Sequence, residues 1–260
     1  MCLLAFAYNH NSDAPLIVIS NRDEFYQRTT LPMHWWPESG ILAGRDQQAG
    51  GTWLGLSKNG RFAAVTNFRD LHRNGAPTES LRSRGDLVTK FLCASENVHD
   101  WTDSLAETCL EYGPFNLVVY DGQDMVYVNN QGDPKQTLTS GVYALSNHQL
   151  DSHWPKVDHA RDQLDKAISN NIVGDHSLPA LLMALSLEKT YAFNLLPNTG
   201  IPADWEETLS SPFIVSEGYG TRAATALIVS AKGKVSVAEQ GYENGQKLGL
   251  NQFSYYISDD

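Results

Sequence analysis

The second residue carries the chemistry that the sequence indicates most directly. Cys2 follows Met1, and aminopeptidases commonly remove an initiator methionine when the next side chain is as small as that of cysteine. A chain that begins at Cys2 has a thiol nucleophile and, on the same residue, an α-amine whose pKa of about 7.7–8.0 suits a general base. The alternative is that Cys2 is a small apolar residue packed in a strand.

Polar residues are expected to approach Cys2 from a neighbouring strand. Segments 2–8 and 15–20 are apolar runs around a polar turn, which predicts a β-hairpin. The end of its second strand lies opposite the start of its first, so Asp23 or Arg22 would approach Cys2. A carboxylate there would hold the terminal ammonium, and an arginine would favour the thiolate. We therefore expect Cys2 to have a lowered thiol pKa and to be the most reactive cysteine.

Two amides and a further arginine are candidates for the same site. Asn67 and Asn147 each end an apolar strand, where an amide is suited to donate to an oxyanion. Arg222 precedes a strand that begins at 223, and would neutralise a developing charge or a substrate carboxylate. The alternatives are that each asparagine only terminates its strand or caps a turn, and that Arg222 forms a surface ion pair.

The order of elements predicts an α+β fold. Beyond the first hairpin, Asn59-Gly60 predicts a second one between 52–57 and 61–67. Helices are predicted over 86–93, 101–112, 155–169 and 177–188, and strands over 115–120, 125–129, 141–147, 212–216, 223–231, 234–240 and, in an otherwise unassigned tail, 253–257. Strands, helices, strands, helices and strands in succession favour sheets packed between helix layers, in one domain spanning 1–260.

Two segments are predicted to be long irregular loops. Residues 31–51 contain Pro32 and Pro37 and are expected to cover the site, with Trp35 and Trp36 as loop anchors or ligand-stacking rings. The second loop runs through 194–204.

Composition excludes several classes of partner. Acidic residues outnumber basic ones by 30 to 19, which argues against nucleic acid and anionic membranes. No apolar run approaches the roughly 20 residues of a membrane span, and the first residues lack a basic leader. The three cysteines form no close pair, so a reducing cytoplasm is expected, with Cys93 and Cys109 in helix cores.

Metal and cofactor motifs are missing from the sequence. The eight histidines contain no His-Glu-x-x-His, and neither Cys-x-x-Cys, a Walker sequence, Gly-x-Gly-x-x-Gly nor Gly-x-Ser-x-Gly occurs. We expect neither a metal nor a cofactor.

Four motifs resemble those of the NRDE family, also called the transport and Golgi organisation protein 2 family. They are Met1-Cys2, Asn21-Arg22-Asp23-Glu24, Gly51-Thr52-Trp53-Leu54-Gly55 and Thr66-Asn67-Phe68-Arg69. The resemblance continues to Gly220-Thr221-Arg222 and covers most of the chain. It implies supporting roles for Asn21, Arg22 and Glu24 beside Asp23.

More distantly, the arrangement is similar to cysteine N-terminal-nucleophile hydrolases of the choloylglycine hydrolase and penicillin V acylase type. That resemblance implies a four-layer αββα sandwich and an amidohydrolase acting on carbon–nitrogen bonds other than peptide bonds, with a small-molecule amide or acyl substrate. It implies Cys2 as nucleophile, Asp23 as partner of the terminal amine and Asn67 as oxyanion donor, and it places Asn147 and Arg222 among the remaining polar site residues. Those hydrolases carry an arginine where Ser20 stands here.

The family resemblance also implies a non-catalytic alternative. Eukaryotic members of the resembled family have been connected with secretory organisation, mitochondria and the handling of haem or lipid. In that alternative, the same pocket binds haem or a lipid without cleaving it.

Overall fold

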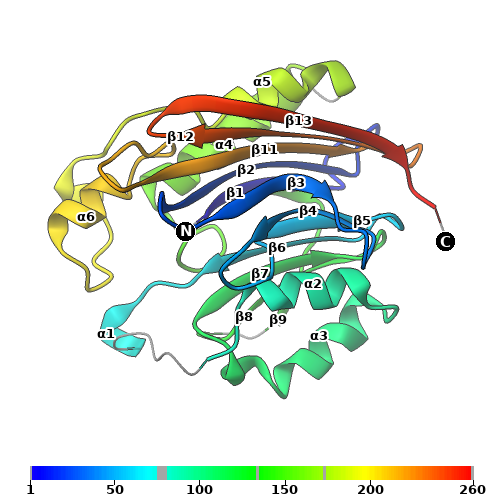
Figure 1. Ribbon diagram of the computed structural model, residues 1–260, viewed down its shortest axis with the longest axis horizontal. Helices are drawn as coiled ribbons and strands as arrows, with labels where there is room; N and C mark the ends of the chain where they lie inside the picture. The colour runs from blue at the N-terminus through cyan, green and yellow to red at the C-terminus, as the bar shows by residue number, and fades with distance from the viewer. Residues whose placement is uncertain (1, 75–80, 133–134, 172–173, 259–260) are drawn as a thin grey trace.

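Two antiparallel β-sheets face each other and carry helices on their outer faces (Figure 1). The computed structural model describes residues 2–74, 81–132, 135–171 and 174–258. Within these ranges every strand pair of the two sheets is antiparallel. The predicted α+β fold, a four-layer αββα sandwich, is confirmed.

The six-stranded sheet holds Cys2 and the Asn-Arg-Asp-Glu motif. Its strand order is β10-β1-β2-β11-β12-β13, with bounds β1 (Cys2–Tyr8), β2 (Leu16–Phe25), β10 (Gly141–Leu145), β11 (Tyr219–Val229), β12 (Lys234–Glu243) and β13 (Gln246–Tyr256). The predicted hairpin of β1 and β2 is present. β2 does not stop before the polar motif but continues through it, because β1 and β11 hydrogen-bond to its two edges.

The seven-stranded sheet follows the chain order from β3 to β9. Its strands are β3 (Thr30–Trp35), β4 (Ile41–Asp46), β5 (Leu54–Ser57), β6 (Phe62–Asn67), β7 (Phe115–Tyr120), β8 (Met125–Asn129) and β9 (Lys135–Thr137). The prediction of an irregular loop over 31–51 is wrong, since β3 and β4 lie there. Pro32 is tolerated because β3 is an edge strand whose register shifts between Leu31 and His34.

Helices cover the outer face of each sheet. α4 (Pro155–Ser169) and α5 (Leu178–Met183) pack on the six-stranded sheet, and α2 (Gly85–Cys93) and α3 (Val98–Ala106) on the other (Figure 1). The short helices α1 (Leu71–Asn74) and α6 (Ala203–Thr208) lie at the end of the sandwich where β1 begins. No helix within the described residues combines the length and apolar character that crossing a membrane requires.

Several element boundaries differ from the predictions. The helix predicted over 101–112 divides into α3 and a 3-10 turn at Cys109–Glu111, and α5 ends five residues before the predicted 188. Residues 212–216 form only an isolated bridge, between Val215 and Gly220. The C-terminal tail is a full strand, β13, whose outer side chains are mostly exposed and therefore give a weak apolar pattern.

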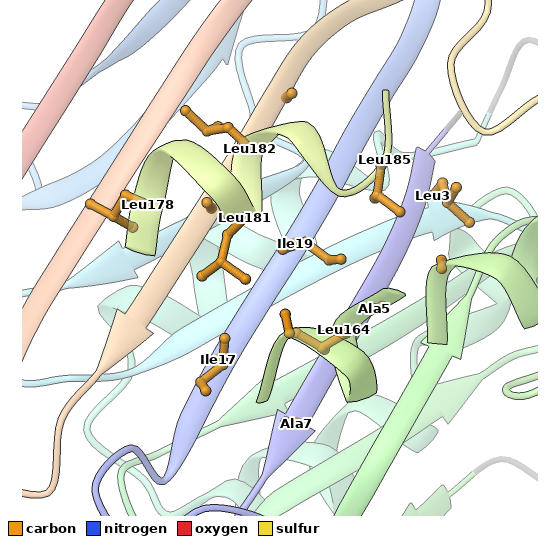
Figure 2. Close-up of a cluster of buried hydrophobic side chains, with 14 of the residues drawn as sticks. Leu3, Ala5, Ala7, Ile17, Ile19, Leu164, Leu178, Leu181, Leu182 and Leu185 are labelled. Atoms are coloured by element: carbon orange, nitrogen blue, oxygen red, sulfur yellow. The ribbon is translucent and has the colours of Figure 1, made fainter. Parts of the chain in front are cut away.

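The side chains of β1 alternate between two cores. Leu3, Ala5 and Ala7 pack toward the helices, where Figure 2 shows Leu164 of α4 near Ala5, while the leucines of α5 lie over β11 and β12. Leu4 and Phe6 face the other sheet. Because side chains alternate along a strand, Cys2 shares the inter-sheet face of Leu4.

Candidate active site

Cys2 is the first residue of β1 and lies at one end of the inter-sheet core. It lies directly opposite Arg22 in the antiparallel pairing of β1 and β2, so the two side chains share one face of the sheet. Its backbone carbonyl accepts a hydrogen bond of 3.2 Å from Oγ of Ser146, which follows β10. Cys2 is 7% exposed. The hairpin and the end of β10 together fix the position of this residue.

The thiols do not have the environments that the sequence suggested. In the chain that retains Met1, burial raises the pKa of the Cys2 thiol, and the opposing effect of Arg22 does not outweigh it. The lowered pKa expected once Met1 is removed stays a prediction. Cys93, predicted to lie in a helix core, is exposed at the end of α2, and Cys109 is half-buried. At neutral pH the Cys2 side chain is therefore a protonated thiol that needs a base.

The Asn-Arg-Asp-Glu motif divides between the two faces of β2. Arg22 and Glu24 face the second sheet with Cys2, whereas Asn21 and Asp23 face the helix layer. The Asn21 amide donates to the carbonyls of Leu185 and Pro212, each at 2.9 Å. Asn21 therefore holds the loops of the helix layer, which is a supporting role.

Arg22, which lies opposite Cys2, is the buried member of a partly exposed charged cluster. Its guanidinium carbon lies 4.4 Å from the centre of the Trp53 ring, and Nη2 is 3.5 Å from Oδ2 of Asp46. Glu24 and Arg28 complete the cluster. The Arg22 side chain is 5% exposed, and its Nη1 has no hydrogen-bond partner among the described residues. A buried unsatisfied donor on the face of Cys2 is suited to stabilise negative charge there.

Gly44 makes room for the ring under Arg22. A Cβ atom at this position of β4 would stand 2.3 Å from the Trp53 side chain, so any larger residue would displace the ring.

Trp35 and Trp36, at the end of β3, do not contact the Arg22 cluster. Nε1 of Trp36 donates to the Ala43 carbonyl, and the Trp35 ring packs against Tyr255. Both act as anchors of the second sheet.

Asp23 is the buried carboxyl on the opposite face. It is 1% exposed, and its Oδ1 accepts a hydrogen bond of 2.8 Å from the Thr221 hydroxyl. Burial raises the pKa of Asp23, and among the nearby charges Lys156 opposes this most strongly. The ionised form of Asp23 therefore depends on its neighbours.

The two asparagines lie together but have different environments. Nδ2 of Asn147 donates to the Asn67 backbone carbonyl at 3.0 Å, and its Oδ1 accepts from Ser146. The side-chain amide of Asn67 is half-buried and has no hydrogen-bond partner among the described residues. Asn67 is therefore available to a ligand, while the Asn147 amide holds the backbone at Asn67.

Arg222 has a different position from the one expected. The pairing of β11 with β2 shifts between Thr221 and Ala223, so Arg222 is the extra residue of a bulge. Its Nη1 donates to the backbone carbonyls of Phe25 and Tyr26, at 3.1 and 2.9 Å. These bonds fix the turn after β2, and the structure gives Arg222 no hydrogen bond to Cys2 or Asp23.

Three further residues of the site were missed by the sequence reasoning: Ser146, Thr221 and Lys156. Thr221 is adjacent to the predicted Arg222, and only the bulge decides which of the two meets Asp23. Lys156 is 2% exposed. It precedes Ala160 by four residues and Leu164 by eight, so the helical spacing of α4 already placed this lysine on the buried face.

No group of three or more His, Cys, Asp or Glu side chains in the described part of the chain is placed to hold a metal ion. Around Cys2 the structure instead offers a thiol, a buried guanidinium on the same face of the sheet and a buried carboxyl on the opposite face.

Comparison with known proteins places the chain in a family. The model of the family described as Transport and Golgi organisation 2 matches residues 1–244. The chain belongs to the Transport and Golgi organisation 2 family. Its relatives include the Transport and Golgi organization protein 2 homolog of Homo sapiens, 30% identical over 92% of both chains, and Transport and Golgi organization protein 2 of Drosophila melanogaster, 24% identical over 92% of both. The resemblance read from the four sequence motifs is thus confirmed.

Similar solved structures include two hydrolases. One is the C2A mutant of a conjugated bile acid hydrolase from Clostridium perfringens, 10% identical, covering 99% of this chain and 98% of that one, with a TM-score of 0.43. The other is a Caenorhabditis elegans ortholog of N-acylethanolamine-hydrolyzing acid amidase, 10% identical, covering 87% and 92%, with a TM-score of 0.43.

Proposed function

We propose that this chain, after removal of Met1, is a cysteine N-terminal-nucleophile hydrolase that cleaves a non-peptide amide or a related acyl compound. The observation that supports the proposal is the pairing of Cys2 with Arg22 on one face of the sheet, with the buried Asp23 next to Arg22 on the opposite face. The end of β6 at Asn67 is tied to the same region, because Asn147 bonds the Asn67 carbonyl and Ser146 bonds both Asn147 and the Cys2 carbonyl.

The first step needs a base, because the buried Cys2 thiol is protonated at neutral pH. Once Met1 is removed, the α-amine of Cys2 takes the thiol proton as sulfur attacks the substrate carbonyl. Asp23, on the adjacent strand, holds this amine in place. Arg22 shares the face of the thiol and stabilises the negative charge as it develops.

The tetrahedral intermediate places negative charge on the former carbonyl oxygen. The side-chain amide of Asn67 donates to that oxygen, and Asn147 keeps the strand end at Asn67 in position. The carbon–nitrogen bond then breaks, and the proton held by the α-amine passes to the leaving amine. A thioester on Cys2 remains, and water hydrolyses it to release the acid and regenerate the thiol.

Turnover of amide substrates tests this proposal. Processed protein is incubated with N-acyl amides of graded acyl length, and the released amine is quantified against Cys2→Ser. We expect at least one acyl class to be hydrolysed by the native protein and the variant to lose this activity. Equal turnover by both would exclude Cys2 as the nucleophile, and no turnover of any amide would favour the haem- or lipid-binding alternative.

A further inference from the structure

The Thr221 hydroxyl lies between a loop of the helix layer and the Asp23 carboxyl. Its Oγ1 accepts a hydrogen bond of 2.9 Å from the backbone amide of Ile214 and donates one of 2.8 Å to Oδ1 of Asp23. The Thr221 amide also donates to the Ile214 carbonyl, at 2.8 Å. One side chain thus links the backbone at Ile214 to the buried carboxyl of the candidate site.

These contacts decide where the hydroxyl proton points. A threonine hydroxyl has one proton to donate and two lone pairs that accept. The Ile214 amide uses one lone pair, and Oδ1 of Asp23 is the acceptor that the described residues offer to the proton. A hydrogen bond donated to a carboxylate favours its ionised form. The Thr221 hydroxyl therefore favours an ionised Asp23 with Oδ1 turned toward β11.

The backbone holds Thr221 at this place. Thr221 lies directly opposite Asp23 in the pairing of β11 and β2, so the two side chains share the helix-facing side of the sheet. The bulge begins immediately after this pair, at Arg222. Gly220 allows the close approach of Ile214, because a Cβ atom at Gly220 would collide with the Ile214 carbonyl. Thr221 and Ile214 are each 1% exposed, so water does not compete for the hydroxyl.

Thr221 is one of several groups that act on Asp23. The charged and titratable groups around this carboxyl are the terminal amine, Cys2 of β1, Arg22 of β2, Tyr219 of β11 and Lys156 of α4. Burial raises the pKa of Asp23, and the positive charges and the Thr221 hydrogen bond oppose that rise. Charges act over a distance in all directions, whereas a hydrogen bond also constrains the orientation of the carboxyl group.

We propose that Thr221 is a positioning residue, whose hydroxyl orients the Asp23 carboxylate so that Asp23 can hold the α-amine of Cys2. The part of this proposal that concerns the amine rests on the proposed function, whereas the hydrogen bond between Thr221 and Asp23 does not. Thr221 contacts no reacting atom and acts through Asp23.

NMR titration of Asp23 tests the hydrogen bond. The carboxyl carbon is assigned through the Asp23 backbone and followed against pH in carboxyl-13C aspartate-labelled protein. Thr221→Val is close in size but has no hydroxyl, so the Asp23 signal should titrate at a higher pH than in the native protein. Thr221→Ser keeps the hydroxyl and should titrate close to the native protein. An Asp23 titration unchanged by Thr221→Val overturns the proposal.

Thr225→Val is the matched control. Thr225 is a buried threonine of the same strand, two residues from Leu227 of the inter-sheet core, so its side chain faces away from Asp23. The control should leave the Asp23 titration unchanged. Because every charged neighbour of Asp23 is retained in these variants, the difference between Thr221→Val and Thr225→Val reports the hydroxyl at Thr221.

A measurement on the native protein applies if Thr221→Val does not fold. A buried hydroxyl proton that donates to a carboxylate exchanges slowly with water, so the Thr221 hydroxyl proton should give a resonance that moves as Asp23 titrates. A hydroxyl proton that exchanges freely, or whose resonance does not respond to the ionisation of Asp23, contradicts the hydrogen bond.

Acylation of Cys2 connects the hydrogen bond to function. In processed protein, Thr221→Val should slow acylation by roughly 10- to 100-fold, the factor that corresponds to a hydrogen bond to a charged group. Thr221→Ser should restore most of the rate. In the Asp23→Asn background, Thr221→Val should have little further effect, because Thr221 acts through Asp23.

A purely structural role for Thr221 predicts a different result. Equal slowing by Thr221→Val with and without Asp23→Asn, or no recovery of the rate in Thr221→Ser, would overturn the positioning role. If the native protein shows no acylation at all, the proposed function fails, while the NMR titration still decides whether Thr221 holds Asp23.

Discussion

Cys2 lies directly opposite Arg22 across β1 and β2, whereas Asp23, the next residue, faces the helix layer on the other side of the same sheet. The two charges of the motif thus approach Cys2 from opposite faces. In the proposed mechanism, Arg22 therefore stabilises the sulfur and Asp23 holds the α-amine.

Asn67 and Asn147 should respond differently to substitution. Asn67→Ala removes an amide without an internal partner, so we expect roughly a 100- to 1,000-fold loss of acylation rate with little change in stability. Asn147→Ala removes a buried amide that bonds the Asn67 carbonyl and the Ser146 hydroxyl, and should destabilise the protein by about 1–3 kcal/mol.

Acylation kinetics and urea unfolding of the two asparagine variants measure both quantities. The opposite pattern, with Asn67→Ala destabilised and fully active, would remove Asn67 from the oxyanion site.

The sequence predicted the architecture because its strongest signals are local. Apolar alternation and Asn59-Gly60 located the hairpins, and helical spacing located α2 and α4. The edge strand β3 was missed because two prolines mask its pattern, although an edge position tolerates Pro32.

The candidate site was only partly predictable, because parts of it depend on contacts between distant segments of the chain. The position of Arg222 depends on a one-residue bulge, which no local pattern reveals. The thiol pKa of Cys2 depends mainly on burial by distant elements, which no local pattern reveals. Lys156 had a usable signal, namely its place in the apolar stripe of α4.

Glu239 should make stability depend on pH. It is buried between the sheets, where its Oε1 accepts a hydrogen bond from the Met33 amide of β3 and burial raises its pKa to about 7. In the unfolded chain the pKa is about 4.3. Any stability that Glu239 contributes is present below about pH 4 and is lost as pH rises through about 7, because ionisation is disfavoured only in the folded state.

Glu239→Gln keeps an acceptor for the Met33 amide and removes the charge. The variant should therefore exceed the native protein in stability by up to about 3 kcal/mol at pH 8, and match it near pH 4. Urea unfolding at the two pH values gives the comparison. A variant less stable than the native protein at pH 8 would show instead that Glu239 is a paired carboxylate, with Arg22 as the candidate partner.

The proposed mechanism requires a free α-amine on Cys2. Intact-mass analysis of acylation, with and without that free amine, tests this requirement most directly. Cys93→Ser and Cys109→Ser are introduced first, because the exposed Cys93 would otherwise react with the probe. Processed protein, protein retaining Met1 and Cys2→Ser are then treated with an acylating substrate analogue at neutral pH, and the adduct is mapped by peptide mass. We predict one acyl group on Cys2 in processed protein and strong suppression in the other two forms, since retention of Met1 converts the basic amine into a non-basic amide. Equal acylation of Cys2 with Met1 retained would contradict the N-terminal-nucleophile mechanism.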